Sequence, residues 1–517
     1  MPRYEHTSIS VYNKTSGEFK GIGRIVFYFY VILNSMSTEI DPQSIERFRR
    51  AIRIDTSWPA GEEGDEVIFS DKDPSDHNPV KLKPETQRAL STLTEFQNFL
   101  VAAYPVFHRV TERTVLNPFC ALYRWPGKQT GAPDTLPVLF LAHYDVVPVD
   151  RELWTTDPFG AEILDDYIYG RGTLDTKSTL ICAMEAAEAL ASKGFVPEQD
   201  IWFVFGGDEE RSGAKGAQKA AAFFRERNIN FSWLLDEGSI VALNQIPGVE
   251  HPLALIGVEE KGFLDIELLV RQTPGHASRP PEHQAAADLA EALIRLSKHP
   301  FPYRLIPSVE GFFTSLSPLV NRTPFQNNLQ SLVLGNPRRL GSLFFRLAGS
   351  SPATRALLRT TLAMTQLFGA KADNILPSEV RAILNLRLLP GDTVESALTY
   401  VQKTIGMDSV IVRPSPYRGA NNPVTADQET AAGRGPGWQN LTKALSETFP
   451  AAVPIPFLVT ATTDSRHYAD LCRAVYRFGP MELEPEEVDR IHGHDERISL
   501  DNLKKGIAFY LRLMEQL

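Results

Sequence analysis

The stretch "LPVLFLAHYD", residues 136–145, decides the fold class, because an uninterrupted apolar run ends there in a histidine and an aspartate. Two further short apolar runs follow, "DIWFVFGG" at 200–207 and "FSWLLDEG" at 231–238. Runs of this kind are typical of parallel strands that are buried on both faces. His143 and Asp145 are costly to bury without partners, so the end of the first run needs a chemical explanation.

Helical patterns separate the three predicted strands. Apolar residues recur at helical spacing in 177–194, which ends at Gly194, and again in 214–228, which ends near Asn228. Alternation of strand and helix predicts an α/β fold with a mostly parallel sheet and helices on its faces.

The chain changes character at about residue 262. Alternating patterns in 262–415 predict a smaller, half-exposed sheet, interrupted by a helix-rich stretch at about 307–370. The apolar face of that stretch suits a core, a lid or a dimer contact equally well. Residues 416–517 return to helical patterns and one apolar run. We therefore expect a main domain built from 36–261 and 416–517, with an inserted α+β domain between them.

Composition and charge exclude several classes of protein. The chain has 517 residues, 43% of them hydrophobic and 22% charged, which is typical of a globular protein. A formal net charge of -10 argues against a nucleic-acid partner. The three cysteines cannot all pair with one another, and Cys182 falls within a helical apolar pattern. We therefore expect a reducing compartment and a cytoplasmic protein.

The N-terminus is the one segment where a targeting signal would fit. An apolar run at 25–33 follows several basic residues, which leaves export open, but it is shorter than the roughly 20 residues that span a bilayer. A helix with Ser37 or Thr38 as its cap is predicted from Met36 onward. We expect residues 1–35 to be an extension outside the fold, and no stable insertion into a membrane.

Acidic residues and a histidine gather at the predicted strand ends. In open parallel sheets the carboxyl ends of the strands form the ligand-binding edge. The groups expected there are His143, Asp145, Asp175, Asp208, Glu209, Glu210, Asp236 and Glu237. So many acids at one edge repel each other unless a cation lies among them.

The residue types indicate which cation. Histidine with carboxylates and without thiolates suits zinc, and cobalt or manganese can occupy the same set. An even number of ligands with one shared carboxylate suits two ions about 3.5–4 Å apart. One more histidine is then needed, and "DRIHGHDERISL" near the C-terminus offers His492 and His494.

Each of these features has an ordinary structural interpretation when it stands alone. A single H-x-D is more often a hydrogen-bonded surface or core group, "DEE" is more often a solvated turn, and "GRG" is an ordinary turn sequence. The acids of "LDEG" also suit a helix cap. The metal interpretation gains its weight from the set, because the groups follow successive strands as one site requires.

Nine short motifs, taken in their order along the chain, resemble the motifs of one family: the co-catalytic zinc family of aminoacylases, acetylornithine deacetylase and carboxypeptidase S. They are "HYDVVPV", "WTTDPFGAEILDDYIYGRGTLDTK", "GGDEERSGAKGA", "LDEGS", "EKGFLDIEL", "TPGHASRPP", "NILPSEVRAILNLRLLPGDT", "TDSRHYADL" and "IHGHDERISL". The helix-rich insert resembles the carboxypeptidase S branch, which also includes N-acyl amino acid hydrolases. The resemblance runs from about residue 90 to the end.

This resemblance implies a catalytic domain (36–261 and 416–517) with a lid domain (262–415), and a ligand set for two zinc ions. His143 is expected to bind one ion and His492 the other, with Asp175 bridging them. Glu210 and Asp236 complete the set, and Asp145 orients the imidazole of His143.

The resemblance also implies how the other residues act. Glu209 is the expected base that takes a proton from the attacking water, and His276 on the lid is expected to stabilise the oxyanion. Arg466 is expected to hold a substrate carboxylate, and Asn374 to add a polar contact from the lid. The implied reaction is hydrolysis of an amide or peptide bond next to a free carboxylate.

Several positions depart from the family's common pattern, and several alternatives stay open. Asp495, Thr462, Ala277 and Thr176 replace residues that relatives more often have, and Thr176 leaves open whether the peptide bond after Asp175 is cis. The substrate is a small peptide or, in the alternative, an N-acyl amino acid. The third interpretation is an inactive, zinc-bound interaction scaffold. Both a monomer and a homodimer are compatible with the sequence.

Overall fold

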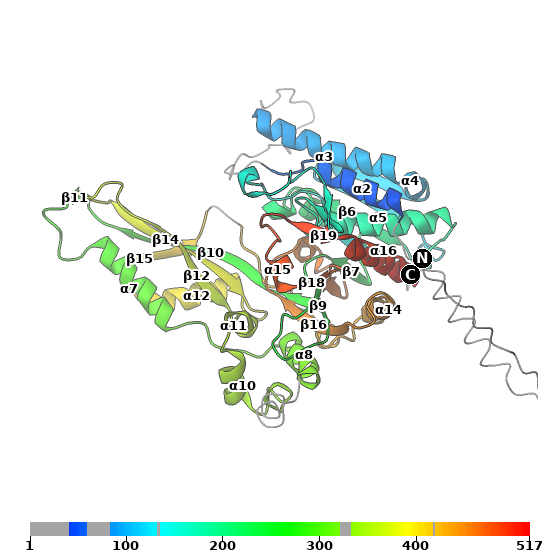
Figure 1. Cartoon of the computed structure of the whole chain (residues 1–517). Helices are drawn as coiled ribbons and strands as arrows, with labels where there is room; N and C mark the ends of the chain where they lie inside the picture. The colour runs from blue at the N-terminus through cyan, green and yellow to red at the C-terminus, as the bar shows by residue number, and fades with distance from the viewer. Residues whose placement is uncertain (1–40, 59–82, 132–134, 321–331, 417–418) are drawn as a thin grey trace, which may run out of the picture. The chain divides into compact units, whose positions relative to one another are not determined.

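The computed structural model describes residues 41–58, 83–131, 135–320, 332–416 and 419–517 (Figure 1). The predicted extension 1–35 and the predicted cap at Ser37 or Thr38 lie outside these residues. The chain divides into two compact units, Met1–Ile45 and Glu46–Leu517, and the elements that build the sheets belong to the second.

Helices and strands follow the alternation that the sequence predicts. The α-helices are α2 (Pro42–Arg53), α3 (Pro84–Ala103), α4 (Pro105–Val110), α5 (Lys177–Ser192), α6 (Ala217–Glu226), α7 (Ala285–Lys298), α8 (Pro307–Leu316), α10 (Gly341–Ala348), α11 (Pro352–Leu358), α12 (Val394–Ile405), α13 (Gln428–Ala431), α14 (Trp438–Thr448), α15 (Pro485–Val488) and α16 (Leu500–Met514). Short 3-10 helices are η1 (Arg151–Leu153), η2 (Glu209–Arg211), η3 (Ser317–Leu319) and η4 (Asp464–Tyr468).

The strands form one large sheet and three smaller ones among the described residues. They are β1 (Glu112–Asn117), β2 (Cys120–Trp125), β3 (Val138–His143), β4 (Ile163–Leu164), β5 (Tyr167–Tyr169), β6 (Ile201–Gly206), β7 (Trp233–Asp236), β8 (Val241–Ala242), β9 (Leu253–Glu260), β10 (Gly262–Arg271), β11 (Gly275–His276), β12 (Thr361–Phe368), β13 (Ile375–Leu376), β14 (Glu379–Leu388), β15 (Val410–Pro414), β16 (Val453–Val459), β17 (Val475–Arg477), β18 (Glu482–Leu483) and β19 (Arg497–Ser499).

The large sheet has the order β1-β2-β6-β3-β7-β17-β9-β8-β18, and β16 pairs with β9 beside this path. Its centre is parallel, because β3 pairs in parallel with both β6 and β7, and β17 pairs in parallel with β7. The carboxyl ends of β3, β6 and β7 therefore meet at one edge of the sheet. This confirms the predicted α/β fold with a mostly parallel central sheet.

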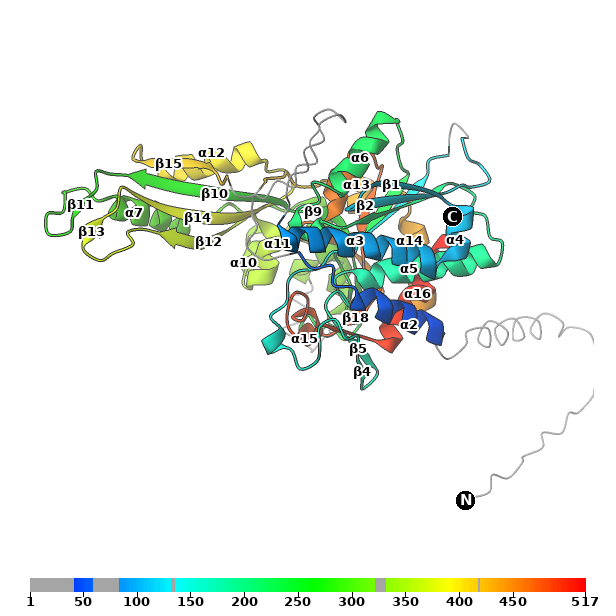
Figure 2. The same ribbon diagram turned by 90° about the horizontal axis from the view of Figure 1, so that it is seen from above.

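Strand β3 is apolar along its length because helices cover both faces of the sheet. Leu139 and Leu141 join a core cluster that includes Ala217 and Phe224 of α6. The ring of Phe140 points to the other face, where its centroid lies 6.0 Å from that of Tyr510 of α16. Figure 2 shows α6 on one side of the strands, with α5 and α16 on the other. Two-sided burial explains why no polar residue interrupts β3 before His143.

A four-stranded antiparallel sheet with the order β12-β14-β10-β15 forms within the predicted insert. Its buried face packs against α7 and α12 through residues such as Leu268, Leu289, Leu384 and Val401. The C-terminal strands β16 and β17 return to the large sheet, as the sequence indicates. The exact boundaries 36–261, 262–415 and 416–517 stay a prediction.

The helix-rich stretch at 307–370 packs in a core, one of the alternatives left open, and it ends in a strand. Its helices α8, α10 and α11 share a core cluster with β9 and β16 of the large sheet, which includes Phe312, Phe344 and Leu458. Its last part is the strand β12 and not a helix, because Thr361–Phe368 pairs with β14. None of the described helices is long and apolar enough to span a bilayer.

Candidate metal centre

Loops that follow the central strands carry the candidate metal ligands. His143 is the last residue of β3, and Glu209 and Glu210 begin η2, which follows β6 after two intervening residues. Asp175 lies in the turn that precedes α5, and the peptide bond after it is cis. His492 comes from the segment between α15 and β19, near the C-terminus of the chain.

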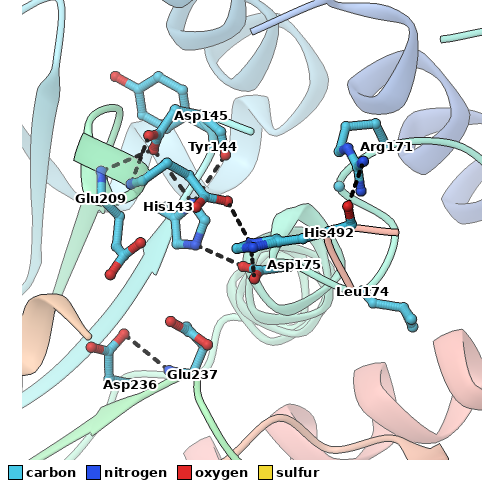
Figure 3. Close-up of polar contacts among 12 residues, drawn as sticks. His143, Tyr144, Asp145, Arg171, Leu174, Asp175, Glu209, Asp236, Glu237 and His492 are labelled. Atoms are coloured by element: carbon cyan, nitrogen blue, oxygen red, sulfur yellow. Dashed lines mark hydrogen bonds and ion pairs between the residues drawn. The ribbon is translucent and has the colours of Figure 1, made fainter. Parts of the chain in front are cut away.

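The first candidate metal group consists of His143, Asp175 and Glu237, which offer ligand atoms within 4.8 Å of one another. Nε2 of His143 lies 3.0 Å from Oδ1 of Asp175 (Figure 3). Nδ1 of the same ring lies 3.0 Å from the carbonyl oxygen of Asp145, to which it donates. A backbone acceptor at Nδ1 fixes the tautomer that leaves Nε2 free to bind a metal.

The second group consists of Asp175, Glu210 and His492. Nε2 of His492 lies 3.0 Å from Oδ2 of Asp175 and 3.2 Å from Oε1 of Glu210. Asp175 therefore turns one carboxylate oxygen toward each histidine. A bridging carboxylate between two ions has this arrangement, so the donor set fits two divalent cations with His and carboxylate ligands.

The electrostatics of these groups favour a bound cation. Burial raises the pKa of Glu237 well above its usual range, and Asp175 and Asp236 raise it further. Hydrogen bonds to Asp175 and Glu210 raise the pKa of His492 to about 10. Burial lowers the pKa of His143, but hydrogen bonds to Asp145 and Asp175 outweigh burial, and the net pKa is raised. Positive charge is therefore stabilised at both histidines, as it is where a metal binds.

Asp236, a predicted ligand, belongs to neither group. Its side chain is 2% exposed, and its two carboxylate oxygens accept hydrogen bonds from the backbone N–H groups of Glu237, at 2.9 Å, and Ser465, at 2.8 Å. The geometry brings Glu237 to His143 and Asp175 in its place. Both acids are expected at this strand end, and the family resemblance implies Asp236 as the ligand, whereas the apolar pattern of the strand does not distinguish the two.

Asp145 contacts more than the histidine that it was predicted to orient. One of its oxygens lies 3.4 Å from Nδ1 of His143. Both oxygens also accept hydrogen bonds from the backbone, one from Glu209 at 3.2 Å and the other from Glu210 at 3.1 Å. Asp145 thus ties the end of β3 to the turn after β6.

Glu209 lies beside the two groups without belonging to either (Figure 3). Burial raises its pKa well above the usual range, against the opposing effect of His143, and Asp464 raises it further. A carboxylate with a raised pKa is suited to taking up a proton near neutral pH. Glu209 therefore combines a raised pKa with a position outside both metal groups.

Arg466, expected to hold a substrate carboxylate, has backbone partners in this structure. Arg466 donates to the carbonyl oxygens of Thr463, at 2.6 Å, and Ser212, at 2.7 Å. His276 in β11 and Asn374, just before β13, are exposed. Figure 1 shows β11 at the end of the four-stranded sheet that points away from β9. Among the described residues, no hydrogen bond or ion pair joins His276, Asn374 or Arg466 to either metal group.

A buried lysine that the sequence does not single out lies two residues after Asp175 in the chain. Lys177 is 0% exposed, and its Nζ donates to the carbonyl oxygens of Ala51, at 3.1 Å, and Ile54, at 2.7 Å. Burial lowers its pKa to about 7. It joins the first turn of α5 to the end of α2, and a lone lysine in "DTKST" gives no sign of that role.

Comparison with known proteins decides the family of the chain. A model of peptidase family M20/M25/M40 matches residues 139–516, which include every residue of both metal groups. The chain belongs to this family. It is a metal-dependent hydrolase, and the predicted relationship to carboxypeptidase S and N-acyl amino acid hydrolases is confirmed.

Two curated relatives represent the two activities that the sequence left open. The chain is 32% identical to "N-fatty-acyl-amino acid synthase/hydrolase PM20D1" of Mus musculus, over 82% of this chain and 82% of that protein. It is also 32% identical to "Probable carboxypeptidase S-like 2" of Dictyostelium discoideum, over 81% of this chain and 79% of that protein.

Solved structures support the fold. An M20 family metallo-carboxypeptidase from Sulfolobus solfataricus aligns with a TM-score of 0.63 and 16% sequence identity. The alignment covers 92% of this chain and 99% of that structure.

Proposed function

We propose that this chain is a two-zinc hydrolase that cleaves an amide or peptide bond next to a free carboxylate, in the manner of a carboxypeptidase S-like peptidase. The observation that carries the proposal is the carboxylate of Asp175, with one oxygen 3.0 Å from Nε2 of His143 and the other 3.0 Å from Nε2 of His492. Cobalt or manganese fits the same ligands.

Five residues hold the two ions in this proposal. His143 and Glu237 bind one ion, His492 and Glu210 bind the other, and Asp175 bridges them. Glu237 replaces Asp236 of the sequence-based set, because the oxygens of Asp236 already accept two backbone hydrogen bonds. The ions, when bound, polarise the scissile carbonyl and lower the pKa of water.

Glu209 moves the proton in the proposed reaction. Its carboxylate takes a proton from the attacking water and gives it to the nitrogen of the leaving amine, which completes hydrolysis without a covalent intermediate. Asp145 supports this step because its carboxylate accepts a hydrogen bond from the backbone N–H of Glu209 and lies 3.4 Å from Nδ1 of His143.

Arg466 is the proposed partner of the substrate carboxylate. Two of its N–H groups donate to the carbonyl oxygens of Thr463 and Ser212, which anchor the guanidinium between two loops. A guanidinium has five N–H donors, so three remain for a carboxylate. His276 and Asn374 are proposed to contact the substrate from the lid, which requires a lid position that brings β11 to the metals.

A peptide and an N-acyl amino acid both offer the bond and the carboxylate that this proposal needs. The N-acyl amino acid hydrolase is the second candidate, supported by the likeness to the mouse protein. The inactive scaffold is disfavoured, because Glu209 and both metal groups are present.

The free thiols of Cys120, Cys182 and Cys472 support a reducing, cytoplasmic location. We propose that the protein is a monomer or a homodimer.

A substrate screen tests the proposal. Purified protein is assayed on dipeptides with a free C-terminal carboxylate and on N-acyl amino acids, with added zinc and with a chelator. Release of the C-terminal amino acid that is lost with chelator and restored by zinc is the expected result. Failure to hydrolyse either class with zinc present would favour the scaffold.

A further inference from the structure

A buried ion pair joins the two loops that carry Asp175 and His492. Nη1 of Arg171 lies 2.6 Å from Oε2 of Glu496. Arg171 is 2% exposed and Glu496 is 0% exposed, although the two residues are far apart in the chain. Neither residue belongs to a candidate metal group.

Glu496 holds the backbone of the turn that ends in Asp175. Its carboxylate accepts hydrogen bonds from the N–H groups of Gly172 at 3.1 Å, Leu174 at 2.6 Å and Asp175 at 3.2 Å. Three backbone donors on one buried carboxylate fix the course of the chain over these residues. The position of the bridging carboxylate therefore depends on Glu496.

Arg171 holds the backbone of the other loop. Its Nη2 donates to the carbonyl oxygens of His492, at 3.3 Å, and Gly493, at 2.9 Å. Figure 3 shows Arg171 beside the backbone that carries His492. His492 has a φ of 61°, in the left-handed region that residues other than glycine seldom adopt. Such a conformation needs support from its surroundings, and Arg171 supplies it directly.

The free-energy cost of burying the charges of Arg171 and Glu496 indicates that the pair has a role in positioning the loops. Taking two charges out of water is expensive, and well-packed apolar residues often stabilise a fold as well as a buried ion pair does. Here Arg171 and Glu496 also direct donor and acceptor atoms at the backbone of two metal-ligand loops. Their hydrogen bonds thus reach the backbone on both sides of the site.

We propose that Arg171 and Glu496 are positioning residues, which set the separation of Asp175 and His492 and thereby the affinity for the ion that these two ligands share. The proposal rests on the proposed two-zinc function and adds the source of the geometry. Because Arg171 contacts the His492 loop, its loss should weaken the ion held by His492 and Glu210. Glu496 also fixes Asp175, so its loss should weaken both ions.

Zinc affinities in single-site backgrounds test the proposal without an activity assay. His143→Ala leaves the site of Asp175, Glu210 and His492, and His492→Ala leaves the other. Arg171→Met is added to each, and zinc affinity is measured by competition with a chromophoric chelator. We expect a loss of about 10- to 100-fold in the His143→Ala background, the range for partners that orient metal ligands, and little change in the His492→Ala background.

Control variants separate positioning from general stability. Arg47→Met removes another largely buried arginine, which pairs with Glu185 through Nε and Nη2. It should lower the melting temperature without changing zinc affinity in either background. Arg171→Lys keeps a cation for Glu496 but does not reproduce the fork that spans two carbonyls, so an intermediate loss is expected. If Arg171→Met does not fold, the lysine variant decides by the same criterion.

The outcomes distinguish this proposal from the one on which it rests. Wild-type protein that binds no zinc overturns the proposed function, and the positioning proposal with it. Wild-type protein that binds two zinc ions, combined with equal affinities with and without Arg171, overturns the positioning proposal alone. Equal losses in both single-site backgrounds also contradict it, because they indicate a general effect on the fold.

Discussion

Asp236 and Glu237 are neighbours in the chain, but their carboxylates have different partners. Asp236 accepts backbone hydrogen bonds from Glu237 itself and from Ser465, whereas Glu237 lies with His143 and Asp175. Asp236 thus holds the end of β7 and the start of η4 in place, and Glu237 is available to a metal.

Replacement of these two acids should have separate consequences. Glu237→Ala should lose one ion per chain and the activity with it, because it removes a ligand. Asp236→Asn should retain two ions and lower the free energy of unfolding by about 1–3 kcal/mol, since one backbone donor loses its acceptor. Elemental analysis and urea unfolding measure the two effects. If Asp236→Asn loses an ion and Glu237→Ala does not, Asp236 is the ligand and Glu237 is not.

Glu209 should affect turnover and not metal content. Glu209→Gln is nearly the same size but cannot take up the proton, so a loss on the order of 10³-fold in kcat is expected, within the range for general acid–base catalysis. Glu210→Gln is the matched control at the next position, and it should weaken the binding of one ion. Near-normal turnover of Glu209→Gln would place the base elsewhere.

Arg466 should matter only for substrates with a free carboxylate. Arg466→Ala should cost about 2–5 kcal/mol in kcat/KM, the range for removing one partner of a desolvated charge pair. Arg466→Lys should also impair the enzyme, because it keeps the charge without the paired geometry. The comparison uses free-acid substrates and the same substrates capped as amides. Equal losses on both would assign Arg466 to the hydrogen bonds with Thr463 and Ser212 alone.

The buried Lys261 should make stability depend on pH. Its Nζ donates to the carbonyl oxygens of Ala356 and Arg359, and burial, with Arg387 nearby, lowers its pKa from 10.5 to about 7. Between pH 7 and 10.5 the unfolded chain binds the proton that the folded chain has released, so this group makes stability rise with pH in that window. Urea unfolding at pH 7, 8 and 9 should show a smaller rise for Lys261→Met. An equal rise in both proteins would mean that Lys261 is charged in the fold.

The central strands and the edge of the sheet could be predicted, because their physical causes are local. A run such as 138–142 has no polar residue, which only two-sided burial explains, and ligands gather where such strands end. β12 could not be predicted in this way. Its sequence "TLAMTQLF" contains good helix formers, and its pairing with β14, a partner distant in the chain, decides its conformation.

Some residues of the candidate metal centre could likewise be predicted from the sequence, and others could not. His143, Asp175, Glu210 and His492 could be named because each lies in a distinctive motif, and the structure brings them together. The choice between Asp236 and Glu237 depends on which way two adjacent side chains turn, and the sequence pattern does not contain that information. The role of Arg171 and Glu496 also could not be predicted from the sequence, because their hydrogen bonds go mainly to backbone atoms of other segments.

The metal content of purified, active protein tests the two-ion site most directly. Elemental analysis should give close to two divalent ions per chain in the wild type. It should give close to one in His143→Ala and in His492→Ala, because each histidine belongs to a different group around Asp175. Full activity in protein that contains no divalent ion would contradict a catalytic metal centre at Asp175.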